Sequence, residues 1–364
     1  MRDKPLDKPF LVAVFLLAAV GLLIFISASM GLLARTGASF SSTAFNQIVF
    51  GLVFGSIAAY LTSRLNYKFW RTYAFYIFLG SLLVSLLVYV PGLGFSHGGA
   101  TRWIIVAGIS FQPAELIKIG FIIYFAAWLS GVKEKIKLFR FGMLPFLIIV
   151  GLVGAILLAQ PDTDTFMVIF AAGLAMFISE GGRFRDILIL GILSLLAIGL
   201  LAMQRPYLMS RITVFLNPAS DPLGAGYQIQ QSLIAIGSGQ ITGRGFGQSI
   251  QKFNFLPEPI GDSIFAVAGE EFGFVGTVSL LLLFLYFTLR GLKIGTQAPD
   301  AFSRLVVVGI VILIIIQAYL NIGAMLGLLP LSGITLPFVS HGGTALFFVL
   351  AEIGIILNIS RYSK

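Results

Sequence analysis

Acidic residues beside an apolar segment are the side chains of this sequence best placed to do chemistry. Asp262 directly precedes an apolar run that begins at Ser263, and Glu270 and Glu271 follow about two helical turns deeper. A charge facing hydrocarbon costs about 2.5 to 3.5 kcal/mol, so such acids survive mainly beside protein, water or a counter-charge. We expect Asp262 to stand in a polar cavity as a general base. The alternative is an N-cap for the following helix.

A second charged group lies at the start of another apolar run. Gln112 precedes Pro113, which suits the first turn of a helix because proline lacks an N–H that would be unpaired there. Glu115 and Lys118 are three residues apart and therefore share a helix face. Two interpretations remain open: the pair neutralises itself, or Lys118 binds an anionic head group while Glu115 holds the lysine in place.

Three further cations could bind phosphate. Arg102 stands beside Trp103, and an arginine fork suits phosphate, although an arginine snorkelling at the membrane interface would have the same sequence pattern. Arg244 lies in the run Gly243 to Gly247, whose backbone could form an anion-binding nest. Lys252 follows in the same segment. We expect all three cations to contact substrate.

Other acids could hold a metal ion. Asp162 and Asp164 lie in the short segment QPDTDT between two apolar runs, where an acid could cap the next helix or contribute to a site. Glu258 lies shortly before Asp262. A divalent cation, Mg²⁺ or Mn²⁺, held by Asp162 or Glu258 would stabilise charge on a leaving group, and the sequence leaves metal use undecided. With no Cys and two His, thiolate sites are excluded and a histidine-rich zinc site is disfavoured.

Composition identifies the elements that must position these residues. The chain has 364 residues, of which 58% are hydrophobic and 11% are charged, and this balance predicts a polytopic, all-α membrane protein. About ten apolar runs have near-spanning length. They fall at 10–32, 45–61, 73–90, 113–129, 141–159, 165–178, 187–203, 263–289, 305–326 and 344–359.

The placement of basic residues predicts orientation. With a cytoplasmic N-terminus, most of the 24 Lys and Arg fall on the inner side, as the positive-inside rule requires, and both termini are cytoplasmic. The expected outer side carries fewer, namely Arg35, Arg102, Arg205, Arg211, Arg244 and Lys252. The longest segment between spans, about 205–262, is also expected outside. Its mixed composition predicts an ordered loop packed over the mouth of the bundle.

Several stretches, in order along nearly the whole chain, together resemble the SEDS family (shape, elongation, division, sporulation). They are GATRWI, FQPAELIK, QPDTDT, NPASDPLGAGYQIQQSLIAIGSG, GRGFGQSIQKFNFLPE, GDSIFAVAGEEFG and LPLSGITLPFVSHGGTALF, the last of which contains Ser340, a candidate substrate contact. The FtsW-like branch fits slightly better than the RodA-like branch. Three positions depart from the family pattern: Ile260-Gly261 replace His-Thr, Asp164 replaces a Gly, and His341 replaces a Tyr.

The resemblance implies a single SEDS-type transmembrane domain over 1–364 in the bacterial cytoplasmic membrane. It implies a peptidoglycan glycosyltransferase that polymerises lipid II at the outer face with inversion, and the essential aspartate of the family falls on Asp262. It also implies a class B penicillin-binding protein as partner, and no nucleic acid. Two alternatives remain: a lipid II flippase, in which carboxylates relay protons, and a scaffold that only activates a transpeptidase. A flippase predicts essential charges on both leaflets, whereas the candidate residues here gather on the outer side.

Overall fold

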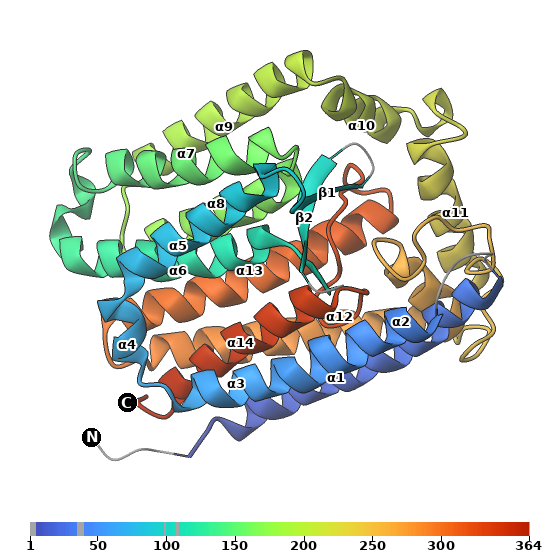
Figure 1. The fold of residues 1–364 in the computed structure, drawn as a ribbon, viewed down its shortest axis with the longest axis horizontal. Helices are drawn as coiled ribbons and strands as arrows, with labels where there is room; N and C mark the ends of the chain where they lie inside the picture. The colour runs from blue at the N-terminus through green and yellow to red at the C-terminus, as the bar shows by residue number, and fades with distance from the viewer. Residues whose placement is uncertain (1–4, 35–39, 98–99, 107–108, 364) are drawn as a thin grey trace.

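All ten apolar runs form helices in the computed structural model, which describes residues 5–34, 40–97, 100–106 and 109–363 (Figure 1). Seven helices in this part of the chain are long and apolar enough to cross a membrane, and three shorter apolar helices account for the other predicted runs. The prediction of an all-α polytopic membrane protein is therefore confirmed. The ten are α1 (Lys8–Ser29), η2 (Asn46–Phe54) continued by α3 (Gly55–Arg64), α5 (Ala74–Leu86), α6 (Pro113–Val132), α7 (Met143–Ala159), α8 (Thr163–Ser179), α9 (Phe184–Gln204), α12 (Ile264–Thr296), α13 (Ala301–Met325) and α14 (Gly343–Ser360).

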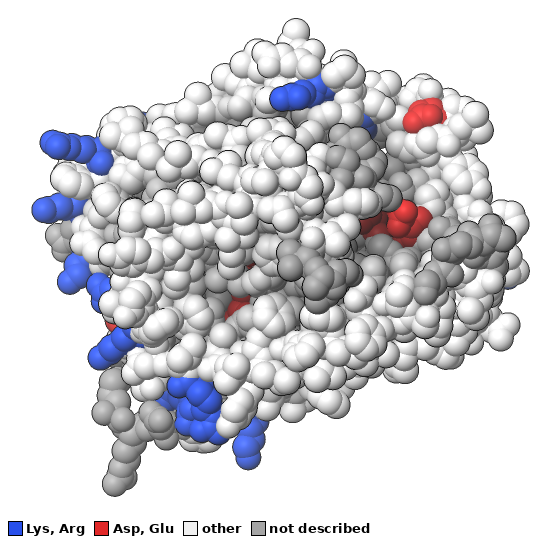
Figure 2. Space-filling model, in the orientation of Figure 1, with Lys and Arg blue, Asp and Glu red and all other residues white. Residues whose placement is uncertain are grey.

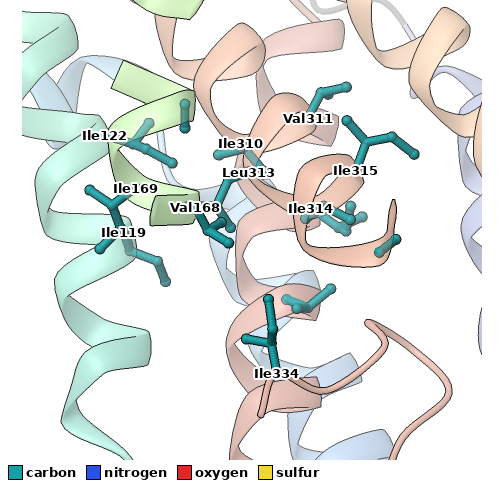
Figure 3. Packing of buried hydrophobic residues seen from close by; sticks show 14 of the residues in the cluster. Ile119, Ile122, Val168, Ile169, Ile310, Val311, Leu313, Ile314, Ile315 and Ile334 are labelled. Carbon is teal, nitrogen blue, oxygen red and sulfur yellow. The ribbon is translucent and has the colours of Figure 1, made fainter. Parts of the chain in front are cut away.

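The centre of the bundle is packed by branched aliphatic side chains. Figure 3 shows α6, α8 and α13 meeting through residues such as Ile122, Ile169 and Ile314, each of them fully buried. Close approach is set by Gly309 on α13, where an added Cβ would lie 2.8 Å from both Ile122 and Met176. Small residues at such crossings let membrane helices pack closely. These three helices form a rigid wall beneath the loops at one end.

Both chain termini lie at the other end of the bundle. The backbone N–H of Asp7 donates to the hydroxyl of Ser360, 3.3 Å away, at the end of α14. Arg290 of α12 also pairs with Asp7 at 2.7 Å, and Arg304 of α13 pairs with Glu180 at 2.6 Å. Figure 2 shows Lys and Arg side chains gathered at this end, while acidic side chains are visible toward the opposite end. The uneven distribution of charge along the sequence is therefore also an uneven distribution between the two ends of the bundle.

The long segment 205–262 is ordered, as predicted. It contains α10 (Pro206–Leu216), η5 (Pro218–Ser220) and α11 (Ala225–Ser238), which follow α9 as an arch in Figure 1. Its last part docks on α12, where Gly273 takes a φ of +63° and an added Cβ would lie 2.3 Å from the backbone nitrogen of Gly243. Only glycine tolerates that conformation and contact. The segment is thus fixed at one end by backbone packing against a membrane helix.

A small antiparallel sheet was not predicted. It consists of β1 (Gly94–His97), β2 (Ala100–Val106) and β3 (Ile109–Phe111) in the order β1-β2-β3, with Phe95 opposite Trp103 and Ile105 opposite Ser110. It lies between α5 and α6 in the chain and places Arg102 and Trp103 beside the helix ends. The remaining short elements are η1 (Met30–Ala34), α2 (Phe40–Phe45), α4 (Tyr67–Thr72), η3 (Leu87–Tyr89) and η4 (Lys133–Lys137).

Candidate active site

A cavity of about 620 Å³ lies at the end of the bundle opposite the termini. Four helices, α6, α8, α12 and α14, begin at or beside its wall, so their N-terminal N–H groups and the positive ends of their dipoles favour an anion there. The remaining wall comes from the sheet, η2, α10, α13 and the loop before α14. Six of the predicted site residues line the cavity, namely Arg102, Gln112, Glu115, Asp162, Glu258 and Asp262.

Asp262 lies in the turn that leads into α12. The turn is closed by the carbonyl of Glu258, which accepts the N–H groups of Gly261 and Ser263 at 3.1 Å each. Glu258 itself takes a φ of +44°, a conformation that is strained for a residue with a side chain. The backbone carbonyl of Asp262 accepts from the amide of Asn321 at 2.8 Å. These contacts fix the direction in which the carboxylate of Asp262 points.

The carboxylate of Asp262 has no hydrogen-bond or ion-pair partner in the described part of the chain. The residue at the cap position of α12 is Ser263, and no side chain caps this helix, so the cap alternative for Asp262 is wrong. Among the described residues, no donor makes a hydrogen bond to this carboxylate. A methyl group placed on Gly333 would lie 3.8 Å from its Oδ2 and 3.8 Å from a guanidinium nitrogen of Arg211. Asp262 is thus an unpaired acid facing the cavity.

The surroundings of Asp262 favour its protonated form. Burial is the largest cause, and the negative charges of Glu258 and Asp164 add to it. The positive charges of Arg211 and Arg102 oppose the effect only in part, and the pKa of Asp262 rises to about 7. A base is most effective when its pKa lies near the working pH. A carboxylate with this pKa can both hold and release a proton near neutral pH.

Asp162 caps a helix and also borders the cavity. Its Oδ1 accepts the N–H of Thr165 at 3.3 Å, so it caps α8 as the simpler interpretation predicts. It also borders the cavity, where Gln112 donates to its Oδ2 at 3.3 Å and Arg102 lies 4.0 Å from its Oδ1. Arg102 further donates to the carbonyls of Gln160 and Pro161. The arginine thus holds this turn in place and keeps a positive charge at the cavity wall.

Glu115 and Lys118 are paired to each other. The ammonium of Lys118 lies 2.6 Å from the Glu115 carboxylate and donates to Gln317 at 3.0 Å, and the lysine side chain is 2% exposed. Glu115 and Gln317 line the cavity, whereas Lys118 lies behind them. The self-neutralising interpretation is therefore the one the structure supports. Direct contact between Lys118 and a head group in the cavity does not fit this arrangement.

Arg244 and Lys252 lie outside the cavity wall, so the expectation that they contact substrate is corrected. Lys252 is fully buried and pairs with Glu271 at 2.8 Å, while Arg244 lies 3.4 Å from Glu270. The expected anion nest is also absent from this part of the chain, because the N–H groups of Arg244 and Gly245 donate to the carbonyls of Glu270 and Glu271. Lys252 is therefore fully engaged by Glu271, and Arg244 lies beside Glu270 rather than at the cavity.

Ser340 also has a different position from the one expected. Its hydroxyl donates to the carbonyl of Gly261 at 2.8 Å and accepts the N–H of Leu336 at 2.8 Å, and its side chain is buried outside the cavity lining. His341, which follows it, does line the cavity and stacks on Phe25 with ring centroids 6.0 Å apart. Burial lowers the pKa of His341, so the ring is neutral at pH 7. Ser340 therefore supports the turn that carries Asp262.

One further ion pair at the site joins two residues that were not among the predicted substrate contacts. Arg211 of α10 lines the cavity, and Asp164 at the start of α8 pairs with it at 2.7 Å. The positive-inside count placed Arg211 on the outer side, and the family pattern marked Asp164 as unusual. Neither observation could show that residues so far apart in the chain meet. No three His, Cys, Asp or Glu of the described residues gather closely enough to hold a metal ion.

Comparison with known proteins identifies the family. The family model for FtsW, RodA and SpoVE, described as cell cycle protein, matches residues 8–364. The chain is 39% identical to stage V sporulation protein E of Bacillus subtilis, with 98% of each chain covered. It is 41% identical to the probable peptidoglycan glycosyltransferase FtsW of Geobacter metallireducens, with 86% of this chain and 83% of the relative covered. A solved structure from a study of "polymerization and crosslinking by a peptidoglycan synthase complex" matches with a TM-score of 0.81, 27% identity and 98% coverage of both chains. The chain therefore belongs to the FtsW, RodA and SpoVE family, the SEDS family that its sequence motifs indicate.

Proposed function

We propose that this protein is a peptidoglycan glycosyltransferase that joins lipid II units into glycan strands at the outer face of the bacterial cytoplasmic membrane. The observation that carries the proposal is the Asp262 carboxylate, which has no hydrogen-bond donor among the described residues and faces a cavity of about 620 Å³. The curated relatives named FtsW are described as probable peptidoglycan glycosyltransferases, which supports the reaction class. The residues of the cavity supply the two requirements of the reaction, a base and positive charge.

In the proposed reaction Asp262 takes the proton of the 4-hydroxyl on the acceptor GlcNAc. The hydroxyl oxygen attacks C1 of the donor MurNAc, the bond from C1 to the pyrophosphate oxygen breaks, and the configuration at C1 inverts. Undecaprenyl pyrophosphate leaves with the electron pair of that bond. Because this leaving group is already stable as an anion, it needs charge stabilisation more than protonation. Arg102, Arg211 and the helix N-termini at the cavity supply that charge.

A divalent cation remains a prediction in this scheme. Mg²⁺ commonly binds one or two protein carboxylates together with substrate phosphates. Asp162 and Glu258 both line the cavity and are the residues that would hold such an ion with the pyrophosphate. A bound cation would offset negative charge on the leaving group.

The proposed topology places both termini in the cytoplasm and the cavity on the outer side. The basic residues at the end where the termini lie support this orientation. We further propose a class B penicillin-binding protein as partner, since the structure with a TM-score of 0.81 comes from a complex that both polymerises and crosslinks. The whole of 1–364 would form one transmembrane domain.

The proposal is tested with purified protein in liposomes, with and without the partner, using fluorescent lipid II. Wild type should give long glycan chains, and Asp262→Asn should give none. Asp221→Asn is the matched control, because Asp221 lies in the same long segment but outside the cavity lining, where its two carboxylate oxygens accept the N–H groups of Gly224 and Ala225 at the start of α11. Asparagine keeps one of these two acceptor oxygens, so the change is confined to this turn. Normal chain lengths from Asp262→Asn would eliminate Asp262 as the base.

The flippase alternative has one observation in its favour. Glu352 of α14 is 1% exposed, and neither of its carboxylate oxygens has a hydrogen-bond partner among the described residues, which is the kind of intramembrane acid that proton-coupled transporters use. The same liposomes separate the two functions. A flippase would move labelled lipid II between leaflets in wild type and would produce no glycan. Polymer formation without such movement supports the transferase.

A further inference from the structure

The ion pair between Arg211 and Asp164 joins two parts of the cavity wall. One guanidinium nitrogen of Arg211 lies 2.7 Å from Oδ2 of Asp164, and the same oxygen accepts the N–H of Gly333 at 3.2 Å. The contact thus connects α10, the start of α8 and the loop between α13 and α14. Of the residues the structure describes, no other side-chain hydrogen bond or ion pair joins α10 to α8 or to that loop.

Arg211 is also the cation best placed to reach a ligand beside Asp262. Its guanidinium and the Asp262 carboxylate approach the same point above Gly333, each 3.8 Å from a methyl group placed there. Its side chain is 25% exposed, whereas the buried lysines Lys118 and Lys252 are 2% and 0% exposed. An arginine fork with free edges can bind two phosphate oxygens at once. In the structure, however, part of that fork is occupied by Asp164.

Asp164 is the unusual member of this pair. The family pattern has a glycine at its position, and glycine could not pair with Arg211. An acid paired with an arginine of the cavity wall weakens anion binding there, because like charges repel across a medium of low dielectric constant. The carboxylate of Asp164 mimics a phosphate at Arg211 and accepts the backbone N–H of Gly333 as well. Both donors would suit a phosphate oxygen equally.

We propose that Arg211 binds the pyrophosphate of the lipid-linked substrate and that Asp164 occupies the same donors until the substrate arrives. Binding would exchange one anionic partner of Arg211 for another, so α10 stays attached to the cavity wall through the ligand. This inference rests on the proposed function, because the ligand is the pyrophosphate of lipid II or of its leaving group. It predicts that Asp164 weakens anion binding and that Arg211 strengthens it.

Binding is measured without turnover, using undecaprenyl pyrophosphate and the purified full chain in nanodiscs. Asp164→Asn should lower the Kd by about 2- to 5-fold, the range expected when a part-exposed competing ion pair is removed. Arg211→Gln should raise the Kd by about 10-fold or more, since bonds to charged groups are lost. In the Arg211→Gln background, Asp164→Asn should have a smaller effect, because only the N–H of Gly333 is then released. Arg205→Gln is the matched control, because Arg205 is an exposed arginine at the N-cap of the same helix and outside the cavity lining.

The outcomes separate this inference from the proposed function. Equal Kd values for wild type, Asp164→Asn and Arg211→Gln would overturn the partner exchange, as would looser binding by Asp164→Asn. Asp262→Asn should bind undecaprenyl pyrophosphate at least as tightly as wild type while losing polymerisation, because a negative charge beside the ligand is removed, so glycosyl transfer is judged by a different variant. If Arg211→Gln is not recovered as folded protein, Arg211→Lys replaces it. Its Kd should be higher than that of wild type, while binding is still measurable, because lysine keeps the charge but lacks the arginine fork. If Arg211→Lys bound as tightly as wild type, the guanidinium of Arg211 would not bind two phosphate oxygens at once.

Discussion

The hydroxyl of Ser340 donates a hydrogen bond of 2.8 Å to the carbonyl of Gly261, the residue before Asp262. The two residues are 79 positions apart, so this bond ties the loop before α14 to the turn before α12. The N–H of His341 adds a second bond of 2.7 Å to the carbonyl of Ile260. Ile260 and Gly261 replace the His-Thr pair of the family pattern, and both bonds use backbone carbonyls. The support of Asp262 therefore does not depend on the side chains that differ.

Ser340→Ala should slow glycan synthesis by lowering kcat while KM changes little. The substitution removes the donor to Gly261 and the acceptor for Leu336, and small displacements of a catalytic group cost about 10-fold or more in rate. The measurement is the initial rate of lipid II polymerisation across substrate concentrations. Ser279→Ala is the control, because the Ser279 hydroxyl is exposed and bonds only to the carbonyl of Val275 in its own helix. A raised KM with unchanged kcat would mean that Ser340 binds substrate after all.

The helices and the cluster of charges at one end could be predicted from the sequence, because both depend on local signals. Runs of apolar residues have the length of a membrane, and the acids adjoin those runs. The site partners could not be predicted in the same way. Glu270 and Glu271 were expected to face protein, water or a counter-charge, and the structure shows counter-charges, because Arg244 and Lys252 reach them from a loop that folds back on α12. A sequence shows how many charges must be paired but not which cation reaches which acid.

Polymerisation should increase with pH through an apparent pKa of about 7. The carboxylate of Asp262 is mostly protonated below that value and cannot accept a proton, while above it the base is free. Glu258 raises this pKa through its negative charge, so Glu258→Gln should shift the rising limb to lower pH. Arg102→Gln should shift it to higher pH, because Arg102 lowers the pKa. The measurement is kcat/KM for lipid II from pH 5.5 to pH 8.5, and a flat profile in wild type would contradict a base with this pKa.

Asp262→Asn should make the protein more stable at high pH. The pKa of Asp262 is raised on folding from 3.8 to about 7. As the pH rises, the carboxyl therefore loses its proton at a lower pH in the unfolded chain than in the folded protein. Stability therefore falls as pH rises from about 4 to 7, and the full penalty is present above 7. Replacing the acid with a neutral amide removes the penalty. The melting temperature of Asp262→Asn should exceed that of wild type at pH 8 and match it near pH 4.

A lower melting temperature for Asp262→Asn at pH 8 would show that the carboxylate makes a stabilising contact in the folded protein. Asp300→Asn is a suitable control, because Asp300 caps α13 in a capping box and its carboxylate accepts from Ser303 at 2.8 Å. That substitution keeps a cap and should shift the melting temperature little at either pH.

The small sheet and the ion pair of Arg211 also show where sequence reasoning ends. The residues of β1 to β3 lie between two membrane helices, and the paired strands are short, so no alternating pattern of useful length is present. Arg211 and Asp164 are 47 positions apart and meet only because α10 folds back toward α8. Both features come from tertiary packing, and both place a cation at the cavity.

Breaking the buried pair of Lys252 and Glu271 should destabilise the protein strongly. Lys252 donates to Glu271 at 2.8 Å, to Ser27 at 3.0 Å and to the carbonyl of Gly247 at 2.9 Å, and neither side chain of the ion pair is exposed. Lys252→Met leaves the carboxylate uncompensated, which costs about 3 to 5 kcal/mol in comparable buried pairs. The double substitution Lys252→Met with Glu271→Gln should recover much of that loss, because no buried charge remains. Melting temperature and yield of folded protein are the measurements.

Arg290→Gln is the control, because it breaks the more exposed pair with Asp7 and should cost only about 0 to 1 kcal/mol. An equal loss of stability in Lys252→Met and Arg290→Gln would contradict this prediction. If Lys252→Met folded normally and bound undecaprenyl pyrophosphate more weakly, Lys252 would instead be a substrate-binding residue.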